Sequence, residues 1–311
     1  MNSETMSTQT PAQSLSSKAL AEFLERHPGR RLKVAGGHNL HVIDEGHGRP
    51  VVMLHGNPSW SFYYRNLLEE LSGNHRVIVL DHIGMGRSDK PDDSTYDYTL
   101  NQRVADLEST LDQLGVTSDI TLVVHDWGGM IGSTFATRHP ERVSRMVILN
   151  TAGFGLPKAK MFPWPLWLSR HTPISSLFVR GFNGFVKGTA WIGTTRNKMS
   201  NDIKKAYLWP YDSWANRRSV HRFVQDIPLT PKDKTWPVLK QVEADLPKLA
   251  SKPMLIAFGL KDLVFDHHFL KGWTDRFPHA EVIRYEDASH YVLEDVGQEL
   301  WTKIRSFLER T

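Results

Sequence analysis

The sequence predicts an α/β protein with a mostly parallel, doubly wound sheet and a helical insertion. Short apolar runs that are typical of buried strands alternate with segments of helical periodicity, and this alternation is typical of parallel sheets. The alternation stops between residues 155 and 232, where no strand pattern is found, and then it resumes. A chain of 311 residues is long enough for one such domain with an insertion.

The composition is that of an ordinary globular protein, with 40% hydrophobic and 23% charged residues. Lys and Arg exceed Asp and Glu by 38 to 34, a formal net charge of +4. We interpret this small excess as scattered along the chain, so it indicates neither a nucleic acid nor an anionic membrane as a partner. The sequence has no cysteine, which excludes disulfide bonds and thiolate metal sites.

The N-terminal segment is rich in Ser, Thr and Gln and lacks the apolar stretch of a signal peptide. We therefore predict that residues 1–18 form a disordered tail. No apolar run along the chain reaches the length of a membrane span, so a cytoplasmic location is expected.

The first predicted elements are a short amphipathic helix at 19–27 and a β-hairpin. The strands of the hairpin, 31–34 and 40–44, flank the turn-forming sequence Gly36-Gly37-His38-Asn39. Two strand and helix pairs follow. Apolar runs at 51–55 and 76–80 predict buried strands, and the segments at 61–71 and 98–114 predict helices.

The remaining elements repeat this order on both sides of the insertion. Before it, the sequence predicts a strand at 120–124, a helix at 130–139 and a strand at 143–149. After it come a strand at 253–258, a helix at 266–277, a strand at 281–285 and a helix at 297–308.

These positions divide the chain into an α/β core, residues 19–154 and 233–311, and a helical cap, residues 155–232. The cap holds 12 of the 32 aromatic residues. We expect most of these rings to form a small second core and a few to line a pocket, because apolar pockets form where domains meet.

A single carboxylate follows one of the predicted buried strands. Asp126 lies just after the strand at 120–124, and Gly128 and Gly129 stand between it and the predicted helix. A polar side chain on such a strand-to-helix turn has the geometry of a nucleophile elbow, with Asp in the position that is often Ser. The alternative is that Asp126 caps the helix that follows.

Other polar side chains follow other predicted strands. Asn57, Asp262 and His290 each come directly after a different one. Because sites in open α/β sheets form beyond the carboxyl ends of the strands, we expect these side chains near Asp126. The order Asp126, Asp262, His290 is the nucleophile, acid and histidine order of the α/β-hydrolase triad, which favours the nucleophile interpretation.

Four other residues compete for the role of the acid. Asn150 ends the strand at 143–149, where some α/β-hydrolases carry their acid, but an amide cannot play that role. Asp266 is better placed to cap the helix that it begins, and Glu286 and Asp287 lie in a turn. The acid is therefore assigned to Asp262.

The other histidines near strand ends are assigned structural or solvent-exposed positions. His55 and His82 lie beside turns, where hydrogen bonding is the more common role, and His267 and His268 lie at the start of a helix. No histidine and glutamate pair at helical spacing has a third ligand nearby, so we expect no metal site and no cofactor.

A carboxylate nucleophile suggests displacement chemistry. Asp126 is ionised at neutral pH and can attack a tetrahedral carbon to give an alkyl ester on the enzyme. His290, oriented by Asp262, would then activate water to hydrolyse that ester. The indole of Trp127 and the amide of Asn57 flank the nucleophile and suit a leaving anion, although packing and turn formation are their plainer alternatives.

Four motifs resemble those of the haloalkane dehalogenases in the α/β-hydrolase superfamily. They are His55-Gly56-Asn57-Pro58, His125-Asp126-Trp127-Gly128-Gly129, Gly259-Leu260-Lys261-Asp262 and Ser289-His290. The resemblance covers about residues 30–310 and is to the third subfamily, whose pattern is Asp-His-Asp/Asn-Trp. It implies that Asp126 is the nucleophile and that Asn57 and Trp127 bind halide.

Further segments are similar to those of the β-lactone decarboxylases of bacterial long-chain olefin biosynthesis. They are Asp81-His82-Ile83-Gly84, Leu149-Asn150-Thr151-Ala152 and the cap segment from Tyr211 to Pro228. Met85 replaces a small residue expected there. This resemblance implies conversion of a dialkyl β-lactone to an olefin and carbon dioxide, in an assembly with the enzymes that form the lactone. If the ring opens at its sp³ carbon, Asn57 and Trp127 would hold a leaving carboxylate.

The sequence thus predicts an enzyme that acts on a small apolar substrate, and dehalogenation is its first expectation. β-Lactone decarboxylation is the alternative. Epoxide hydrolysis is weaker, because it would use Tyr207 and Tyr211 and leave Asn57 without a purpose. A non-catalytic receptor or scaffold would have a degraded triad. Substrate length and oligomeric state, including a homo-oligomer, are left open.

Overall fold

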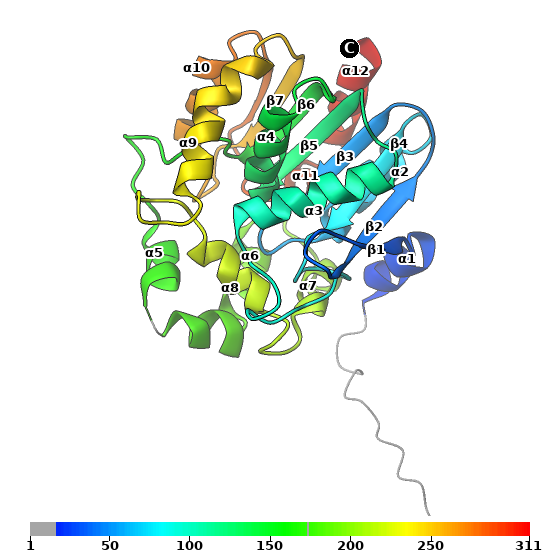
Figure 1. The fold of residues 1–311 in the computed structure, drawn as a ribbon. Helices are drawn as coiled ribbons and strands as arrows, with labels where there is room; N and C mark the ends of the chain where they lie inside the picture. The colour runs from blue at the N-terminus through cyan, green and yellow to red at the C-terminus, as the bar shows by residue number, and fades with distance from the viewer. Residues whose placement is uncertain (1–16, 173) are drawn as a thin grey trace, which may run out of the picture.

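The computed structural model describes residues 17–172 and 174–311, which form one eight-stranded sheet with helices on both faces (Figure 1). In chain order the strands are β1 (Arg30–Lys33), β2 (Asn39–Glu45), β3 (Pro50–Leu54), β4 (Arg76–Asp81), β5 (Ile120–Asp126), β6 (Val143–Thr151), β7 (Met254–Gly259) and β8 (Glu281–Tyr285). Their order in the sheet is β1-β2-β4-β3-β5-β6-β7-β8. Only β2 runs antiparallel to its neighbours, β1 and β4. The predicted mostly parallel sheet is confirmed.

Two hydrophobic cores lie on the two faces of the sheet. One face is covered by α1 (Lys18–Arg26), α2 (Arg65–Leu71), α11 (Val292–Val296) and α12 (Gln298–Arg310). The other is covered by α3 (Leu100–Gln113), α4 (Trp127–Arg138), α9 (Trp236–Asp245) and α10 (His267–Arg276). Successive strand residues serve opposite cores, as Leu122 and Val123 do, because side chains alternate across a strand. Both faces are apolar, which explains why the central strands are continuous apolar runs.

Several helix boundaries differ from the sequence prediction. The segment predicted as one helix at 61–71 consists of a 3₁₀ turn, Ser61–Tyr64, followed by α2. The helices α9 and α11 were not predicted, and a short 3₁₀ turn, Leu246–Leu249, follows α9. Of the predicted tail, residues 1–16 lie outside the described residues. Ser17 and Lys18 are the N-cap and first residue of α1.

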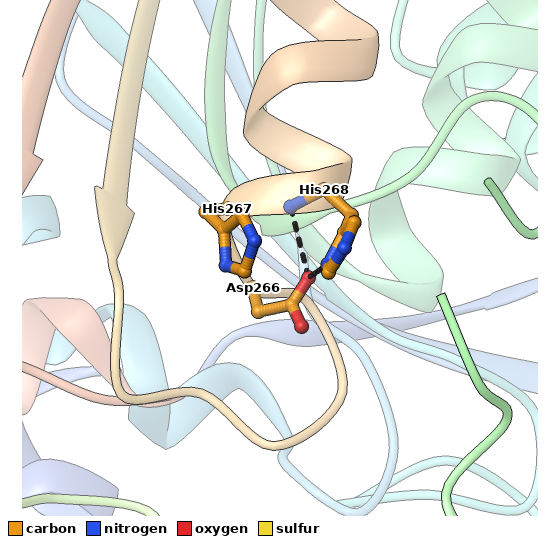
Figure 2. A group of neighbouring side chains, drawn as sticks. All are labelled: Asp266, His267 and His268. Atoms are coloured by element: carbon orange, nitrogen blue, oxygen red, sulfur yellow. Dashed lines mark hydrogen bonds and ion pairs between the residues drawn. The ribbon is translucent and has the colours of Figure 1, made fainter. Parts of the chain in front are cut away.

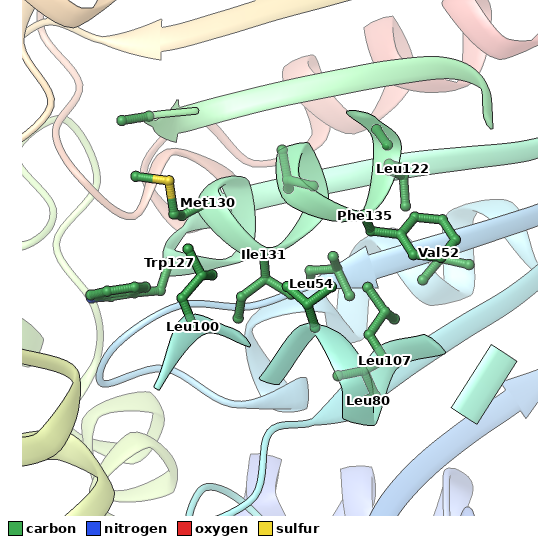
Figure 3. Close-up of a cluster of buried hydrophobic side chains, with 14 of the residues drawn as sticks. Val52, Leu54, Leu80, Leu100, Leu107, Leu122, Trp127, Met130, Ile131 and Phe135 are labelled. Atoms are coloured by element: carbon green, nitrogen blue, oxygen red, sulfur yellow. The ribbon is translucent and has the colours of Figure 1, made fainter. Parts of the chain in front are cut away.

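The helix α4 begins at Trp127, three residues before the predicted start. Gly128 and Gly129 belong to its first turn, where they allow close packing. A β-carbon at Gly128 would collide with the carbonyl oxygen of Leu54 in β3, and one at Gly129 would collide with the Thr151 side chain in β6. Figure 3 shows Ile131 and Phe135 of α4 beside Leu54 and Val52 of β3. The start of α4 therefore lies directly against the strand ends.

The predicted cap segment, 155–232, contains only helical elements among its described residues. They are α5 (Trp164–His171), the π-helical turn η2 (Leu177–Gly181), α6 (Gly184–Ile192), α7 (Asn201–Leu208), the 3₁₀ turn η3 (Trp209–Tyr211) and α8 (Arg218–Gln225). They lie together at one end of the molecule, below the sheet in Figure 1. The Asn57 side chain donates to the carbonyl of Val220, 3.1 Å away, so α8 lies over the loop that follows β3.

Across the described ranges, 17–172 and 174–311, no helix is long and apolar enough to cross a bilayer.

Candidate active site

Asp126 is the last residue of β5 and has an unusual backbone conformation, with φ of 50° and ψ of −125°. Such a conformation is strained for a residue with a β-carbon. Its side chain makes no helix-capping hydrogen bond. Instead, Oδ1 accepts the backbone N–H of Asn57 at 2.5 Å. A β-carbon at Gly56 would collide with this carboxylate, so the close approach of the two loops requires glycine there.

His290 lies between two carboxylates. Its Nδ1 is 2.8 Å from Oδ2 of Asp262, and its Nε2 is 3.9 Å from Oδ2 of Asp126. The first distance is a hydrogen bond, whereas the second is too long for one. All three side chains are buried. The structure thus brings together Asp126, Asp262 and His290, which follow β5, β7 and β8.

Burial and charge shift the pKa values of two members of this group. Burial raises the pKa of Asp126 to about 6, although His290 and the backbone N–H groups of Asn57 and Trp127 act in the opposite direction. Burial lowers the pKa of His290, but Asp262 and Asp126 raise it more, and the result is above the ordinary value for histidine. Opposite charges therefore support each other in this buried site.

Asp262 is held by Asn150 and by its own loop. The Asn150 side chain at the end of β6 donates from Nδ2 to Oδ2 of Asp262 at 3.1 Å and to the carbonyl of Gly259 at 2.9 Å. Its Oδ1 accepts the N–H of Gly259 at 2.8 Å, and Oδ1 of Asp262 accepts the N–H of Val264 at 2.7 Å. Sequence reasoning excluded Asn150 as the acid but missed that it supports the acid. The adjacency of β6 and β7 creates this contact, and single-strand patterns do not reveal adjacency.

Asn57 and Trp127 flank Asp126, and both are mostly buried. One amide hydrogen of Asn57 is used by the Val220 carbonyl, and its Oδ1 is buried without a partner among the described residues. Since Nδ2 carries two hydrogens, a second remains for another acceptor. The Trp127 ring packs against Phe223 of α8 with 5.3 Å between ring centroids. Cap residues therefore form part of the surroundings of both predicted donors.

Sequence reasoning missed several residues around His290. The ring of Phe265 stacks against its imidazole with 6.0 Å between centroids, and His125 Nε2 hydrogen-bonds to its backbone carbonyl at 2.8 Å. The motif containing His125 was noted, but only the sheet shows that β5 and the loop after β8 meet there. Burial lowers the pKa of His125 well below its ordinary value, so it is a neutral structural group.

The other candidate carboxylates lie away from His290. Asp266 is the N-cap of α10 and accepts the backbone N–H of His268 at 3.0 Å, as predicted. Glu286 and Asp287 are exposed in a turn. Figure 2 shows Asp266, His267 and His268, whose ligand atoms all lie within 4.8 Å of one another. Their carboxylate is already paired with the ammonium group of Lys160 at 2.6 Å, which competes with any cation there.

The remaining histidines and tyrosines have structural partners. His55 hydrogen-bonds to the carbonyl of Gly56 and accepts the N–H of His82. The hydroxyl of Tyr207 donates to Glu294 at 2.7 Å, and that of Tyr211 donates to the carbonyl of Ser59 at 3.2 Å. Neither tyrosine is free to hold an epoxide oxygen as described, which argues against epoxide hydrolysis.

The geometry of this group suits nucleophilic displacement. Oδ1 of Asp126 is held by a backbone N–H, whereas Oδ2 faces Nε2 of His290 without a hydrogen bond. A carboxylate oxygen held in this way can attack an electrophilic carbon without prior proton removal. Trp127 directly follows Asp126, and the backbone of Asn57 donates to its carboxylate, so these two residues are the candidates to hold a leaving anion.

A profile of the alpha/beta hydrolase fold matches residues 49–295. The chain is 54% identical over 275 residues to the cis-3-alkyl-4-alkyloxetan-2-one decarboxylase of Shewanella oneidensis, which covers 88% of this chain and 86% of that protein. It is 33% identical over 282 residues to a haloalkane dehalogenase of Mycolicibacterium paratuberculosis. That alignment covers 86% of this chain and 87% of the dehalogenase. The crystal structure of the haloalkane dehalogenase DatA from Agrobacterium tumefaciens C58 has a TM-score of 0.79 at 22% identity and covers 90% of this chain and 96% of that one. This last likeness shows the fold alone.

Proposed function

The chain belongs to the alpha/beta hydrolase family and to its haloalkane dehalogenase-like enzymes, and from this premise we propose that it is a β-lactone decarboxylase. It would convert a dialkyl β-lactone into an olefin and carbon dioxide. The observation that carries the proposal is the buried carboxylate of Asp126, which accepts the backbone N–H of Asn57 and faces Nε2 of His290. The 54% identity to an oxetanone decarboxylase favours a lactone over a haloalkane, for which the identity is 33%. This places the alternative of the sequence analysis ahead of its first expectation.

The first step is displacement at the ring carbon that bears the lactone oxygen. Oδ2 of Asp126 forms a bond to this carbon while the carbon–oxygen bond of the ring breaks. The ring oxygen leaves as part of a carboxylate, and the product is an alkyl ester of Asp126. The Trp127 indole and the free amide hydrogen of Asn57 hold the new carboxylate.

The second step is fragmentation. The carboxylate loses carbon dioxide, the electron pair of the broken carbon–carbon bond forms the double bond, and the ester oxygen of Asp126 leaves with its electrons. The nucleophile is regenerated without water. Displacement inverts the attacked carbon and places the ester oxygen opposite the carboxylate, so the two alkyl groups stay on the same side. A cis lactone therefore gives a cis olefin.

The test uses the purified chain with a cis-dialkyl β-lactone and, separately, with 1,2-dibromoethane. The proposal expects cis-olefin and carbon dioxide from the lactone, and Asp126→Asn should abolish both because the amide cannot attack. Release of bromide without any olefin would overturn the proposal in favour of dehalogenation. A β-hydroxy acid from the lactone would instead indicate hydrolysis.

The role of His290 separates the two chemistries further. In dehalogenation His290 must activate water, so His290→Phe with 1,2-dibromoethane should accumulate an alkyl ester visible by intact mass. In the fragmentation above, the ester is discharged without water. His290→Phe should therefore release olefin from the lactone without a persistent adduct, but more slowly, because Asp126 loses the charge that favours its ionised form. A stable lactone-derived adduct on that variant would contradict the fragmentation step.

The partner assignment stays a prediction. A strained lactone must come from a lactone-forming enzyme, and the resemblance to the olefin-pathway enzymes implies an assembly with it. Co-purification of the tagged chain with such an enzyme from its own cells would test that expectation separately from the activity.

A further inference from the structure

Exposed apolar side chains are concentrated on the cap. Of the 13 large hydrophobic residues that are exposed in the described part of the chain, 12 lie between residues 156 and 214. The most exposed of these 12 are Met161 at 87%, Trp164 and Ile174 at 73%, and Phe182 at 65%. We call these 12 residues the apolar cap surface: Leu156, Met161, Trp164, Trp167, Leu168, Ile174, Leu177, Phe178, Phe182, Trp191, Ile192 and Trp214. A concentration of this kind marks a surface that contacts an apolar partner.

The helix α5 has its apolar side turned outwards. Only Ser169 is buried in this helix, whereas Trp164, Trp167 and Leu168 are exposed. A helix on a globular protein normally places its apolar side on the core. In Figure 1, α5 lies at the outer edge of the cap, at the lower left. This orientation exposes two tryptophan rings to water, which is unfavourable. Contact with an external apolar phase would remove that cost.

The positive charge of the chain is also concentrated on the cap. Residues 155–232 contain 13 Lys and Arg against three Asp, a formal charge of +10. The rest of the chain contains 25 against 31, a formal charge of −6. The expectation of a scattered excess was therefore wrong. The small net charge of +4 conceals a basic cap on an acidic core.

The basic groups lie among the exposed rings. The ammonium group of Lys204 is 4.9 Å from the centre of the Trp191 ring, and the guanidinium group of Arg180 is 4.5 Å from that of Trp214. Lys158 and Lys187 are exposed on the same segment. Tryptophan and phenylalanine beside lysine and arginine is the composition of proteins that lie in the headgroup region of a bilayer.

We propose that the apolar cap surface binds an anionic phospholipid bilayer. The rings enter the boundary between headgroups and acyl chains, and the Lys and Arg side chains contact lipid phosphates. Lys160, Arg170, Arg196, Arg218 and Arg222 are paired with carboxylates of the core, so the cap presents less than its formal charge. Charge complementarity still favours an anionic bilayer over a second copy of the chain, because the remaining basic groups of two caps would repel each other. The protein would lie on the membrane without spanning it. This inference does not depend on which reaction the enzyme catalyses.

The test is co-sedimentation of the full chain with large unilamellar vesicles at low salt. One set of vesicles is pure phosphatidylcholine, and the other contains about 30% phosphatidylglycerol, a proportion chosen to give a strongly negative surface. We expect binding to the anionic vesicles only, a blue shift of tryptophan fluorescence on binding, and release by raised salt. No binding to the anionic vesicles would overturn the proposal.

Two pairs of variants show whether the apolar cap surface is responsible. Lys158→Glu with Lys187→Glu should weaken binding by about tenfold or more, since each basic group near the surface contributes substantially. The matched control, Lys33→Glu with Arg284→Glu, makes the same charge change at exposed positions on the two edge strands β1 and β8 and should bind as the unchanged chain does. Equal losses in the two pairs would contradict the location of the site.

The apolar part is tested by Trp164→Ser with Phe182→Ser. This variant should lose the fluorescence shift and most of the binding, whereas Trp164→Phe with Phe182→Trp should retain both. Light scattering of the unchanged chain and of both variants measures their oligomeric state. If the serine variant converts a dimer into a monomer while binding to vesicles is unchanged, the surface joins two copies of the chain and the membrane proposal is wrong.

Discussion

Asp126 is a buried carboxylate that must be ionised to act as a nucleophile. Burial opposes ionisation, whereas the N–H of Asn57 and the imidazole of His290 favour it. The balance leaves the pKa of Asp126 at about 6. The carboxyl group is therefore mostly ionised at neutral pH and becomes protonated when the pH falls slightly below neutral. A weakly stabilised carboxylate is a better nucleophile than a strongly stabilised one, because fewer interactions are lost in the transition state.

The pH dependence of the reaction follows from this pKa. We expect kcat/KM for the lactone to be constant near neutral pH and to fall about tenfold per pH unit below pH 6, because protonated Asp126 cannot attack. Since His290 titrates next to Asp126, the measured value belongs to the pair. Initial rates between pH 4.5 and 8.5 measure it, with unfolding monitored in parallel. A rate that stays unchanged down to pH 4.5 would mean that the pKa of Asp126 is not raised.

Asn150 gives a second prediction for a single residue. Asn150→Asp would place a carboxylate against Oδ2 of Asp262 and against the carbonyl of Gly259, where the amide now donates. We expect a loss of at least about tenfold in kcat and of about 3 kcal/mol in the free energy of unfolding, because an uncompensated charge is buried. Asn74→Asp, on an exposed loop, is the control.

The readout specific to positioning is the titration of His290, followed by NMR of its imidazole. A second nearby carboxylate should raise its pKa further, whereas a purely structural defect would leave that pKa where it is. If Asn150→Asp retains full activity and an unchanged imidazole titration, Asn150 does not position Asp262.

At the scale of elements, the packing of α4 determines where Asp126 lies. Its first turn packs directly on β3 and β6, so neither Gly128 nor Gly129 has room for a side chain. This contact holds the start of the helix against the strand ends and fixes the turn that carries the carboxylate. The glycines therefore serve packing in the helix as well as the turn that the sequence suggested.

Replacing one of these glycines should be destabilising in spite of helix propensity. Gly129→Ala favours the helix by about 1 kcal/mol but forces a methyl group into Thr151, and we expect a net loss of about 1–3 kcal/mol. Gly188→Ala in α6 is the matched control, since nothing lies within 4 Å of the added carbon there, and it should gain about 0.5–1 kcal/mol. Urea denaturation measures both. Equal effects of the two substitutions would show that packing at Gly129 is not tight.

Elements were predicted correctly where their own sequence determines them, and less well where contacts with distant segments do. All eight strands were predicted. Burial on both faces makes the central strands apolar runs in any context, whereas the mostly exposed β1 was predicted from the hairpin turn that follows it. The start of α4 was misplaced because Gly128 and Gly129 read as turn residues unless the strands beneath them are known. The helix α11 is only five residues long, too short for a periodic pattern.

The candidate site was predictable to the same extent. Chain order and strand ends indicated Asp126, Asp262 and His290, which the structure brings together. The contacts that support them, such as Asn150 to Asp262, cross between strands far apart in the sequence. Sequence patterns along one element contain no information on such neighbours.

The whole molecule depends on how the cap is attached to the core. Asp295 in α11 is a fully buried carboxylate that joins the two. It accepts the backbone N–H groups of Thr195 and Asn197 in the cap segment, at 2.8 Å and 2.7 Å for the closest oxygens. It also accepts the N–H of Ser289 at 2.6 Å, next to His290. The Asp295 side chain thus holds both the cap segment and the backbone next to His290, the proposed catalytic histidine.

Asp295→Asn should loosen the cap and misplace His290 together. An amide has one acceptor oxygen in place of two, so at least one buried N–H loses its partner, and we expect a loss of about 3 kcal/mol or more in the free energy of unfolding. Glu299→Gln is the control, because Glu299 also pairs with a cap residue, Arg196, but at an exposed site worth about 1 kcal/mol or less. Limited proteolysis below the melting temperature should cut Asp295→Asn first between residues 155 and 232, and kcat should fall in parallel. Cleavage spread evenly over core and cap would mean that the two unfold as one unit and that Asp295 holds the whole fold.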